Sequence, residues 1–531
     1  MENKKTKIIS IGAVVALALT VITATYAYFN AQVGDPAVAD IKINANTVDT
    51  FTFASGSAIS FSINQDNFAS GAGNQTGSTY ASAMLTANNK TNTATEHYYM
   101  YLNIENNTFT YSINTNTPEI IMTVKNSVGN EVTDISTLNH VIVTGANGTQ
   151  VSGYDITNNS GLITLFDNRE ITTTSSKEEK WNITITFVNY DENQNANAGK
   201  SMSAKVMIQK EVIPQVVSDV CSNGTNLATC ITTLANKSIP SATNIYHHDS
   251  SLSNGAGDNS YRYAGASDVV NNFVCFGSNE STCPTDNLYR IIGVFGNNVK
   301  LIKYDYGTTD ELGTDGDYSK TFKEWGMDSI YKGTYGDGER IGVYYWNNTT
   351  QKNTWSESLL NKTNLNTNFI NNIGEEWANK IATTTWKVGG NTYSNIYSKT
   401  PSVVYQNEIV NPVTTNTTDN ATEYTAKIGL MYVSDYMYAA PQDKWTLVGN
   451  GSATTDYRAA TSVNWMYMGL YEWTISRLAD DSGGAFTVDY DGYVSDDGVD
   501  YYNAVRPSFS LLSSVTYSKG DGTQNSPIRI N

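Results

Sequence analysis

Short segments that alternate apolar with polar residues set the strongest limit on how this chain can fold. The clearest of them covers residues 181–187, where every second residue is apolar. Such alternation indicates a half-buried strand, because successive side chains of a strand point to opposite faces of the sheet. Turn residues such as Gly129-Asn130 and Ser160-Gly161 separate the segments, which is typical of a β-sandwich. We therefore expect residues 30–210 to form an all-β sandwich domain.

Nine segments of this domain have the composition of strands. They are residues 51–53, 58–63, 98–104, 109–113, 119–124, 140–143, 162–166, 181–188 and 204–208. The chain as a whole contains 35 tyrosines, and only 16% of its residues are charged. Tyr-rich, polar chains usually form exposed β-domains, whose tyrosines pack at one end and bond water at the other. The net charge of −18 argues against a nucleic-acid partner and suits a surface protein that binds divalent cations.

The first 29 residues have the pattern of an export signal. Three lysines among the first seven residues precede an apolar run over residues 8–29. Thr25-Tyr26-Ala27 fits the small-x-small rule for cleavage, which predicts a cut between Ala27 and Tyr28. The alternative is an uncleaved membrane anchor, because an apolar run of about 20 residues is long enough to span a bilayer. Both interpretations predict an extracytoplasmic protein, either secreted or held at the cell surface through its N-terminal segment.

The junction at the end of this leader also resembles a known family. Residues 24–30 read Ala-Thr-Tyr-Ala-Tyr-Phe-Asn. This segment resembles the signal-peptide end of the TasA/camelysin family of exported bacterial matrix and fibre proteins. The resemblance extends loosely over the first domain, through its strand spacing and its closing strand. It implies a jelly-roll-like sandwich and self-association into fibres, as in a biofilm matrix.

Four cysteines occur as two close pairs, Cys221 with Cys230 and Cys275 with Cys283. In an exported chain such spacing indicates two short disulfides. Free thiols and pairing across the two groups stay open as alternatives. A zinc site fits poorly because neither pair has the CxxC spacing that tetrahedral zinc sites commonly use.

The segment 211–240 is predicted to be a linker followed by a short helix, and residues 241–531 to be an α+β domain. Pro214 interrupts the linker, and Ser218 is the expected N-cap of a helix over residues 218–234. The second domain shows a strong hairpin signal over residues 288–304. Helices are expected over residues 354–371, 374–384 and 433–439.

The end of the chain carries a second resemblance. Trp473, the turn before Val494 and Val505-Arg506-Pro507 form a spaced pattern. These positions resemble an uncharacterised bacterial surface module with segments of the form W-L-R-S, V-x-x-x-G and V-R-P, although here Trp473 is followed by Thr-Ile-Ser-Arg. The match spans about residues 270–530. The pattern is similar to C-type-lectin-like and formylglycine-generating-enzyme-like folds, and it implies a lectin-like domain such as adhesins use.

Two residues of this signature are candidates for ligand binding. Arg506 lies in an otherwise apolar strand and must find a partner, because an unpaired buried guanidinium is very costly. That partner is either a carboxylate of the protein or a ligand. Trp473 is either part of the core or a platform for a sugar ring, and the same alternatives hold for Trp465.

Acidic turns near the C-terminus are the best metal candidates. Asp489, Asp491, Asp496 and Asp497 crowd carboxylate oxygens into nine residues, and calcium needs six to eight oxygen ligands. The segment lacks the terminal Glu of an EF-hand loop, so solvated hairpin turns are the structural alternative. His247-His248-Asp249 offers transition-metal ligands, although adjacent side chains of a strand point apart.

Sequence fingerprints of catalysis do not single out a site. The chain contains no GxSxG, HExxH, P-loop or dinucleotide-binding motif, and it has only four histidines. We therefore expect a non-enzymatic surface or matrix protein for adhesion or recognition, whose partners are other copies of itself or surface glycans and proteins. The alternatives are a calcium-assisted carbohydrate-binding lectin and an enzyme on a formylglycine-generating-enzyme-like fold.

Overall fold

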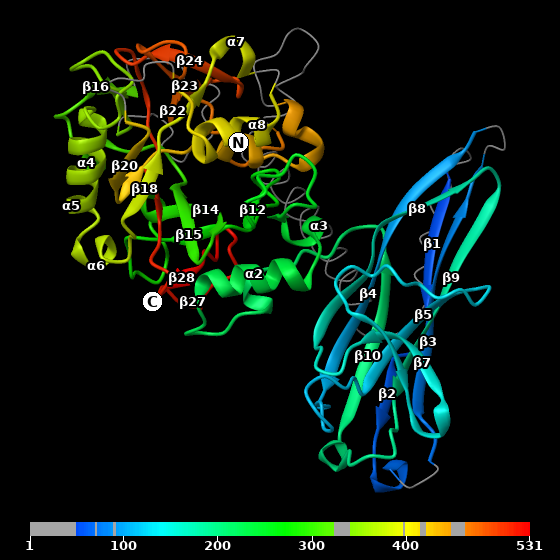
Figure 1. The fold of residues 1–531 in the computed structure, drawn as a ribbon. Helices are drawn as coiled ribbons and strands as arrows, with labels where there is room; N and C mark the ends of the chain where they lie inside the picture. Colours follow the sequence, from blue (N-terminus) through cyan, green and yellow to red (C-terminus); the bar gives the residue numbers. More distant parts are fainter. Residues whose placement is uncertain are drawn as a thin grey trace, which may run out of the picture. The chain divides into compact units, whose positions relative to one another are not determined.

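The computed structural model describes residues 49–68, 72–88, 92–322, 340–396, 399–414, 421–447 and 462–531. The predicted leader, with its cleavage point between Ala27 and Tyr28, lies outside these residues. The chain divides into two compact units, an N-terminal unit Met1–Val212 and a C-terminal unit Ile213–Asn531. The sequence placed the corresponding boundary at residue 210. Both units are rich in antiparallel sheet (Figure 1).

The N-terminal unit contains two antiparallel sheets. The first has six strands in the order β1 (Thr50–Ser55), β3 (Gln75–Thr86), β9 (Ser176–Phe187), β5 (Ile120–Asn126), β7 (Gln150–Asp155) and β6 (His140–Thr144). The second has four strands in the order β2 (Ile59–Ser62), β10 (Ser201–Gln209), β4 (Ala94–Asn107) and β8 (Gly161–Thr173).

One apolar core lies between these two sheets. Ile183 and Ile185 of β9 belong to the same buried cluster as Leu102 and Ile104 of β4. Each pair is spaced by two residues, so the alternation in the sequence directs one face of each sheet inward. The prediction of a β-rich, sandwich-like N-terminal unit is therefore confirmed.

The strand predictions fail at three places in this unit. Residues 109–113 are not a strand, because the backbone amides of Ser112 and Ile113 donate instead to the carboxylate of Glu119, at 2.6 and 3.2 Å. Strand β3 was not predicted, and its inward residues include the small side chains Ala81 and Ala83. Nor was β7, a short strand between β5 and the edge strand β6.

The C-terminal unit is built around two sheets, the first antiparallel and the second mixed. One contains β11 (Ile245–His248), β12 (Ser260–Tyr263), β14 (Leu288–Phe295), β15 (Asn298–Lys303), β26 (Ser508–Ser510) and β21 (Ile428–Gly429), with β13 (Phe273–Cys275) paired to β14. The other contains β16 (Tyr318–Thr321), β17 (Gly342–Tyr345), β25 (Tyr502–Ala504), β22 (Glu472–Leu478), β23 (Gly484–Val488) and β24 (Val494–Gly498), with β19 (Gly390–Asn391) paired to β22. Two-stranded ladders join β18 (Thr384–Lys387) to β20 (Glu423–Ala426) and β27 (Tyr517–Lys519) to β28 (Arg529–Ile530). The predicted hairpin over residues 288–304 is the β14–β15 pair.

Helices of the C-terminal unit are short. They include α2 (Leu227–Lys237), α3 (Pro240–Thr243), α4 (Thr309–Leu312), the π-helix η7 (Leu360–Phe369) that continues into α5 (Ile370–Asn372), α6 (Glu375–Ala378), α7 (Tyr393–Ile396), α8 (Pro401–Tyr405) and α9 (Val433–Tyr438). Among the described residues, no helix combines the length and the apolarity that crossing a bilayer requires.

The predicted start of the helix at Ser218 is wrong. Helix α2 begins at Leu227, and its N-cap is Asn226, whose side-chain oxygen accepts from the amide of Thr229 at 3.0 Å. Ser218 lies instead in a separate turn of 3₁₀ helix, Val217–Asp219. The predicted helix over residues 374–384 likewise shortens to α6, because Ile381 forms a bridge with Leu511 and the amide of Ala382 donates to the carbonyl of Ser510 at 2.8 Å.

All four cysteines are paired as their spacing predicts. The bond Cys221–Cys230 joins the loop before α2 to the first turn of that helix, and the two Cα atoms are 5.5 Å apart. The bond Cys275–Cys283 closes the loop between β13 and β14, with Cα atoms 5.8 Å apart. The two predicted disulfides are therefore confirmed.

Candidate functional site

The acidic turn between β23 and β24 is the best-defined candidate site. The two strands pair from Gly484↔Gly498 to Val488↔Val494, and the turn of residues 489–493 joins them. The amide of Asp489 donates to the carbonyl of Tyr493 at 2.8 Å, and the amide of Gly492 donates to the carbonyl of Asp489 at 2.9 Å. Gly492 has φ +93°, a conformation that side chains other than glycine rarely adopt. The sequence Asp-Gly thus closes a tight hairpin.

Two tyrosines from outside the hairpin hold this turn in place. The hydroxyl of Tyr436, in α9, donates to the carbonyl of Gly492 at 2.5 Å. The hydroxyl of Tyr467 donates to the carbonyl of Tyr490. Because these bonds fix the carbonyls on either side of Asp491, the turn has a defined shape before any ligand arrives.

Asp489 carries the strongest electrostatic perturbation of the turn. Its side chain is 5% exposed, and burial, with the nearby charges of Asp491 and Asp497, raises its pKa to about 7. The hydroxyl of Thr487 lies 3.4 Å from its Oδ1. This carboxyl therefore exchanges its proton near neutral pH, and a bound cation would favour the ionised form.

Asp496 and Asp497 lie further along β24 and diverge. Adjacent residues of a strand point to opposite faces, so their carboxylates do not converge. Asp497 accepts from the side-chain amide of Asn503 at 3.1 Å, and burial raises its pKa. Within the parts of the chain that the structure describes, no three or more His, Cys, Asp or Glu residues are grouped to hold a metal ion. The four aspartates are thus brought to one hairpin, while a shared calcium centre stays a prediction.

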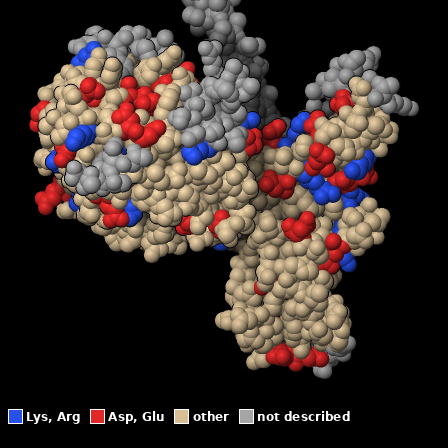
Figure 2. Space-filling view, turned by 45° about the horizontal axis from the view of Figure 1, so that its top comes forward, with Lys and Arg blue, Asp and Glu red and all other residues tan. Residues whose placement is uncertain are grey.

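Tyrosines surround the acidic hairpin. The rings of Tyr471 and Tyr490 lie 5.3 Å apart, and Tyr490 is 37% exposed. Tyr501, in the turn after β24, is 61% exposed. Acidic side chains also form patches on the C-terminal unit, at the left in Figure 2. Exposed aromatic faces beside carboxylates can stack on a sugar ring and accept bonds from its hydroxyls.

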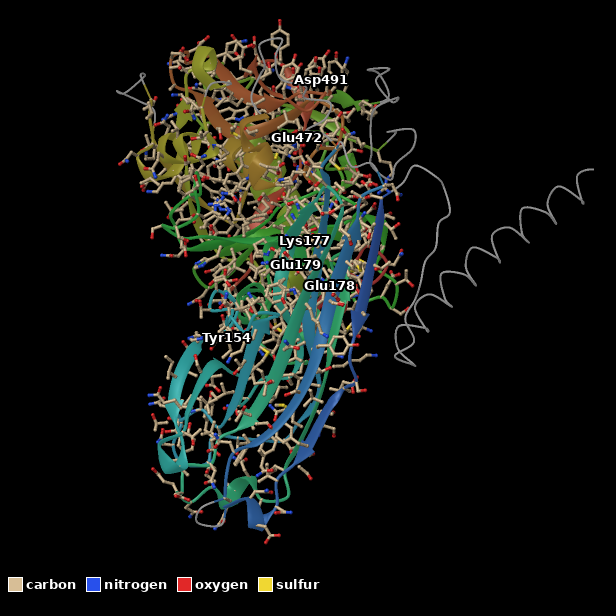
Figure 3. All side chains as sticks on the ribbon, turned by 90° about the vertical axis from the view of Figure 1, so that its right-hand side faces the viewer. Tyr154, Lys177, Glu178, Glu179, Glu472 and Asp491 are labelled. Atoms are coloured by element: carbon tan, nitrogen blue, oxygen red, sulfur yellow. A yellow bond between two sulfur atoms is a disulfide. The ribbon has the colours of Figure 1, made fainter. Side chains whose placement is uncertain are left out.

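Arg506 lies in the interior with a carboxylate partner. Its Nε donates to Oε1 of Glu472 at 2.7 Å, and its Nη2 donates to Oε2 of Glu472 at 2.9 Å and to the carbonyl of Met466 at 2.6 Å. Arg506 is 1% exposed and Glu472 is 2% exposed. Figure 3 labels Glu472 and Asp491 in this unit. The bidentate pair ties β22 to the segment that follows β25.

Trp473 and Trp465 are also interior residues. The indole of Trp473 donates to the carbonyl of Tyr344 at 2.8 Å, and that of Trp465 donates to the carbonyl of Tyr263 at 2.9 Å. Both side chains are essentially inaccessible to solvent. In this structure the two tryptophans and Arg506 are therefore parts of the core. Any of them could bind a ligand only if it became exposed.

His247 and His248 do not converge on a metal. His247 stacks on Tyr261 with ring centroids 4.2 Å apart, and it lies 3.6 Å from Asp249. His248 is fully buried, and its Nδ1 accepts from the amide of Ala256 at 3.2 Å. Burial, together with the charge of Arg262, lowers the pKa of His248 to about 2. This histidine is therefore a neutral core residue.

A buried charged cluster at the start of α9 escaped the sequence analysis. Asp435 pairs with Lys300, whose Nζ lies 2.5 Å from Oδ2, and with Arg262 at 3.5 Å. Glu408 accepts from the amides of Val433 and Ser434, at 3.2 and 3.1 Å. Burial raises the pKa of Glu408 to about 7. These groups come from four separate segments, and no local motif connects them.

The N-terminal unit has its own polar cluster between the two sheets. Tyr98 of β4 donates to Glu179 of β9 at 2.7 Å, and Arg169 of β8 donates to the same carboxylate at 2.8 Å. The indole of Trp181 donates to the hydroxyl of Tyr98 at 2.9 Å. Figure 3 labels Glu179 and its neighbour Lys177, which lies 3.1 Å from it. All these groups are satisfied by one another, which indicates a structural role.

No protein-family model matches this chain, and a search of curated proteins finds no relative of it.

Proposed function

We propose that this chain is an exported bacterial surface or matrix protein that recognises an extracellular partner and catalyses no reaction. The observation that carries the proposal is the pair of disulfides in the C-terminal unit. Such bonds form and persist in oxidising compartments outside the cytoplasm. The basic and apolar leader in the sequence supports the same compartment.

In this proposal the N-terminal unit is a jelly-roll-like domain for assembly, as the resemblance to the TasA/camelysin family implies. Its six-stranded sheet ends at β6, and Ile142 of that strand is 66% exposed. An apolar residue on an edge strand favours pairing with another chain. The C-terminal unit is the lectin-like recognition domain. Because Cys275 and Cys283 are bonded to each other, the formylglycine-generating-like alternative, which requires reactive cysteines, is disfavoured.

Mass spectrometry of the protein recovered from the culture medium and cell surface tests the proposal. We expect a mature N-terminus at Tyr28 and both disulfides intact. Recovery of the intact chain in the cytosol with reduced thiols would exclude it. An intact N-terminus in the membrane fraction, with both disulfides formed, would select the anchored form of the same protein.

A second candidate function is calcium-assisted binding of a carbohydrate at the acidic hairpin. The exposed ring of Tyr490, next to Asp491 in the turn, favours it. A glycan array in calcium and in chelator is the test, with Asp491→Asn as the site variant and Asp443→Asn, an exposed aspartate of another segment, as the control. We expect chelator and Asp491→Asn to abolish binding. If no glycan on the array is bound and calcium leaves the Tm unchanged, this function is excluded.

A further inference from the structure

Among the described residues of the C-terminal unit, four arginines are fully buried, and three of them have hydrogen-bond acceptors. Arg506 is held by Glu472, and Arg262 lies 2.8 Å from Asp258. Arg290 donates to the side chains of Asn272 and Ser267 and to the carbonyl of Val270. Each of these three guanidinium groups thus has acceptors in the interior, although Nη1 of Arg262 has none.

Arg477 is the fourth, and none of its guanidinium nitrogens has a hydrogen-bond partner. Its side chain is 0% exposed, and Nε, Nη1 and Nη2 are all without an acceptor in the described structure. Burial lowers its pKa to about 10, so the group is still charged at neutral pH. Five N–H donors and a positive charge are therefore enclosed without compensation, which a stable protein rarely tolerates.

The surroundings of Arg477 in the sheet leave its side chain without a neighbour of opposite charge. Gly390 of β19 lies opposite it on one side, and Ala485 of β23 lies opposite it on the other. The next residue in this row is Asp497 of β24, one strand further on. The carboxylate of Asp497 accepts from Asn503 instead. Two small residues thus flank a cation that the row does not neutralise.

We propose that Arg477 anchors a binding site for an oxyanion, such as a sulfate or a carboxylate. A guanidinium presents a planar fork of N–H groups that matches two oxygens of such an anion. Water molecules alone could accept hydrogen bonds from the fork, but they bring no charge to balance the cation. An anion supplies both the hydrogen-bond acceptors and the negative charge. This site is separate from the acidic turn, and the inference does not depend on the proposed function.

The test compares thermal unfolding of the exported protein in sodium sulfate, sodium acetate and sodium glucuronate with that in sodium chloride at matched ionic strength. Tryptophan fluorescence reports mainly on the C-terminal unit, because eight of the nine tryptophans follow residue 213. We expect at least one oxyanion to raise the Tm of the wild type by about 2–5 °C over chloride at saturation. A response to sulfate assigns the site to inorganic anions, and one to glucuronate but not acetate assigns it to acidic sugars.

Variants separate a specific site from a general salt effect. Arg477→Met should lose the oxyanion response, and without oxyanion it should be at least as stable as the wild type, because it removes an uncompensated charge. Arg290→Met, which removes a buried arginine that already has acceptors, should keep the response. Equal Tm shifts in the wild type and Arg477→Met would overturn the proposal.

A direct measurement covers the case in which Arg477→Met does not fold. Equilibrium dialysis of the wild type with radioactive sulfate or glucuronate should find about one bound anion per chain at saturation. Arg477→Lys, which keeps the charge but loses the fork, should bind at least tenfold more weakly. Absence of saturable binding to the wild type, or equal binding to the lysine variant, would contradict the site.

Discussion

At the scale of single residues, buried charges dominate the C-terminal unit. Arg506 and Glu472 lie 34 residues apart in sequence and form a bidentate pair in the interior. Removing water from both groups is costly, and the pair is stable because each partner compensates the other. Removing one partner therefore lowers the free energy of unfolding by more than the intact pair adds to it.

We predict that Arg506→Met destabilises the protein by about 3–5 kcal/mol, because Glu472 is left as a buried, uncompensated carboxylate. The double variant Glu472→Leu/Arg506→Met should recover most of this loss, because neither charge then remains. Urea unfolding followed by tryptophan fluorescence measures both. Losses that simply add in the double variant would show that the two side chains act independently.

Glu408 predicts a dependence of stability on pH. Its pKa is raised to about 7 in the folded protein, against 4.5 for an ordinary glutamate. Below about pH 4.5 the group is protonated in both states and changes nothing. As pH rises from 4.5 to 7, the unfolded chain loses this proton before the folded protein does, so stability falls, by up to about 3 kcal/mol above pH 7.

Glu408→Gln should remove this contribution. The stability of the variant relative to the wild type is expected to increase steadily between pH 4.5 and 7 and then to level off. Unfolding free energies measured across this range give the difference directly. Asp489 contributes a slope of the same sign to both proteins and cancels in the comparison. A difference that does not vary with pH would show that Glu408 ionises normally in the folded state.

At the scale of secondary-structure elements, local patterns predict strands well where the inward residues are large. The predicted strand 98–104 lies within β4, and all of the predicted strand 181–188 except its last residue lies within β9. Strand β3 was missed because its inward positions include Ala81 and Ala83, which do not stand out as apolar in the sequence. The same holds for the candidate functional residues. The aspartates of the acidic hairpin are close together in the sequence and could be predicted from it. Lys300 and Asp435 are 135 residues apart, and only the fold brings them together.

The start of α2 gives a prediction with a matched control. The side chain of Asn226 caps this helix by accepting from the amide of Thr229, whereas Ser218 lies outside the helix. Asn226→Ala should therefore cost about 1 kcal/mol, and Ser218→Ala should be nearly neutral. Urea unfolding of the two variants shows which of the two residues caps the helix. A larger loss of unfolding free energy for Ser218→Ala would support the longer helix, over residues 218–234, that the sequence predicted.

At the scale of the whole molecule, the two units have separate apolar cores. The cluster of the N-terminal unit contains residues from Ile59 to Val206, and both clusters of the C-terminal unit contain residues only from Val217 onward. Units with their own cores can unfold in separate transitions. The cysteines distinguish them, because all four follow residue 213.

We therefore predict that a reductant lowers the unfolding temperature of one transition and leaves the other in place. Each disulfide closes a short loop, over sequence separations of 9 and 8 residues, and should contribute about 2.5 kcal/mol by restricting the unfolded chain. Calorimetry of the full chain with and without reductant, alongside tryptophan fluorescence, identifies which transition moves. The one that moves should be the one that fluorescence detects, since the N-terminal unit contains Trp181 alone. A single transition that shifts as a whole would mean that the two units unfold together, despite their separate cores.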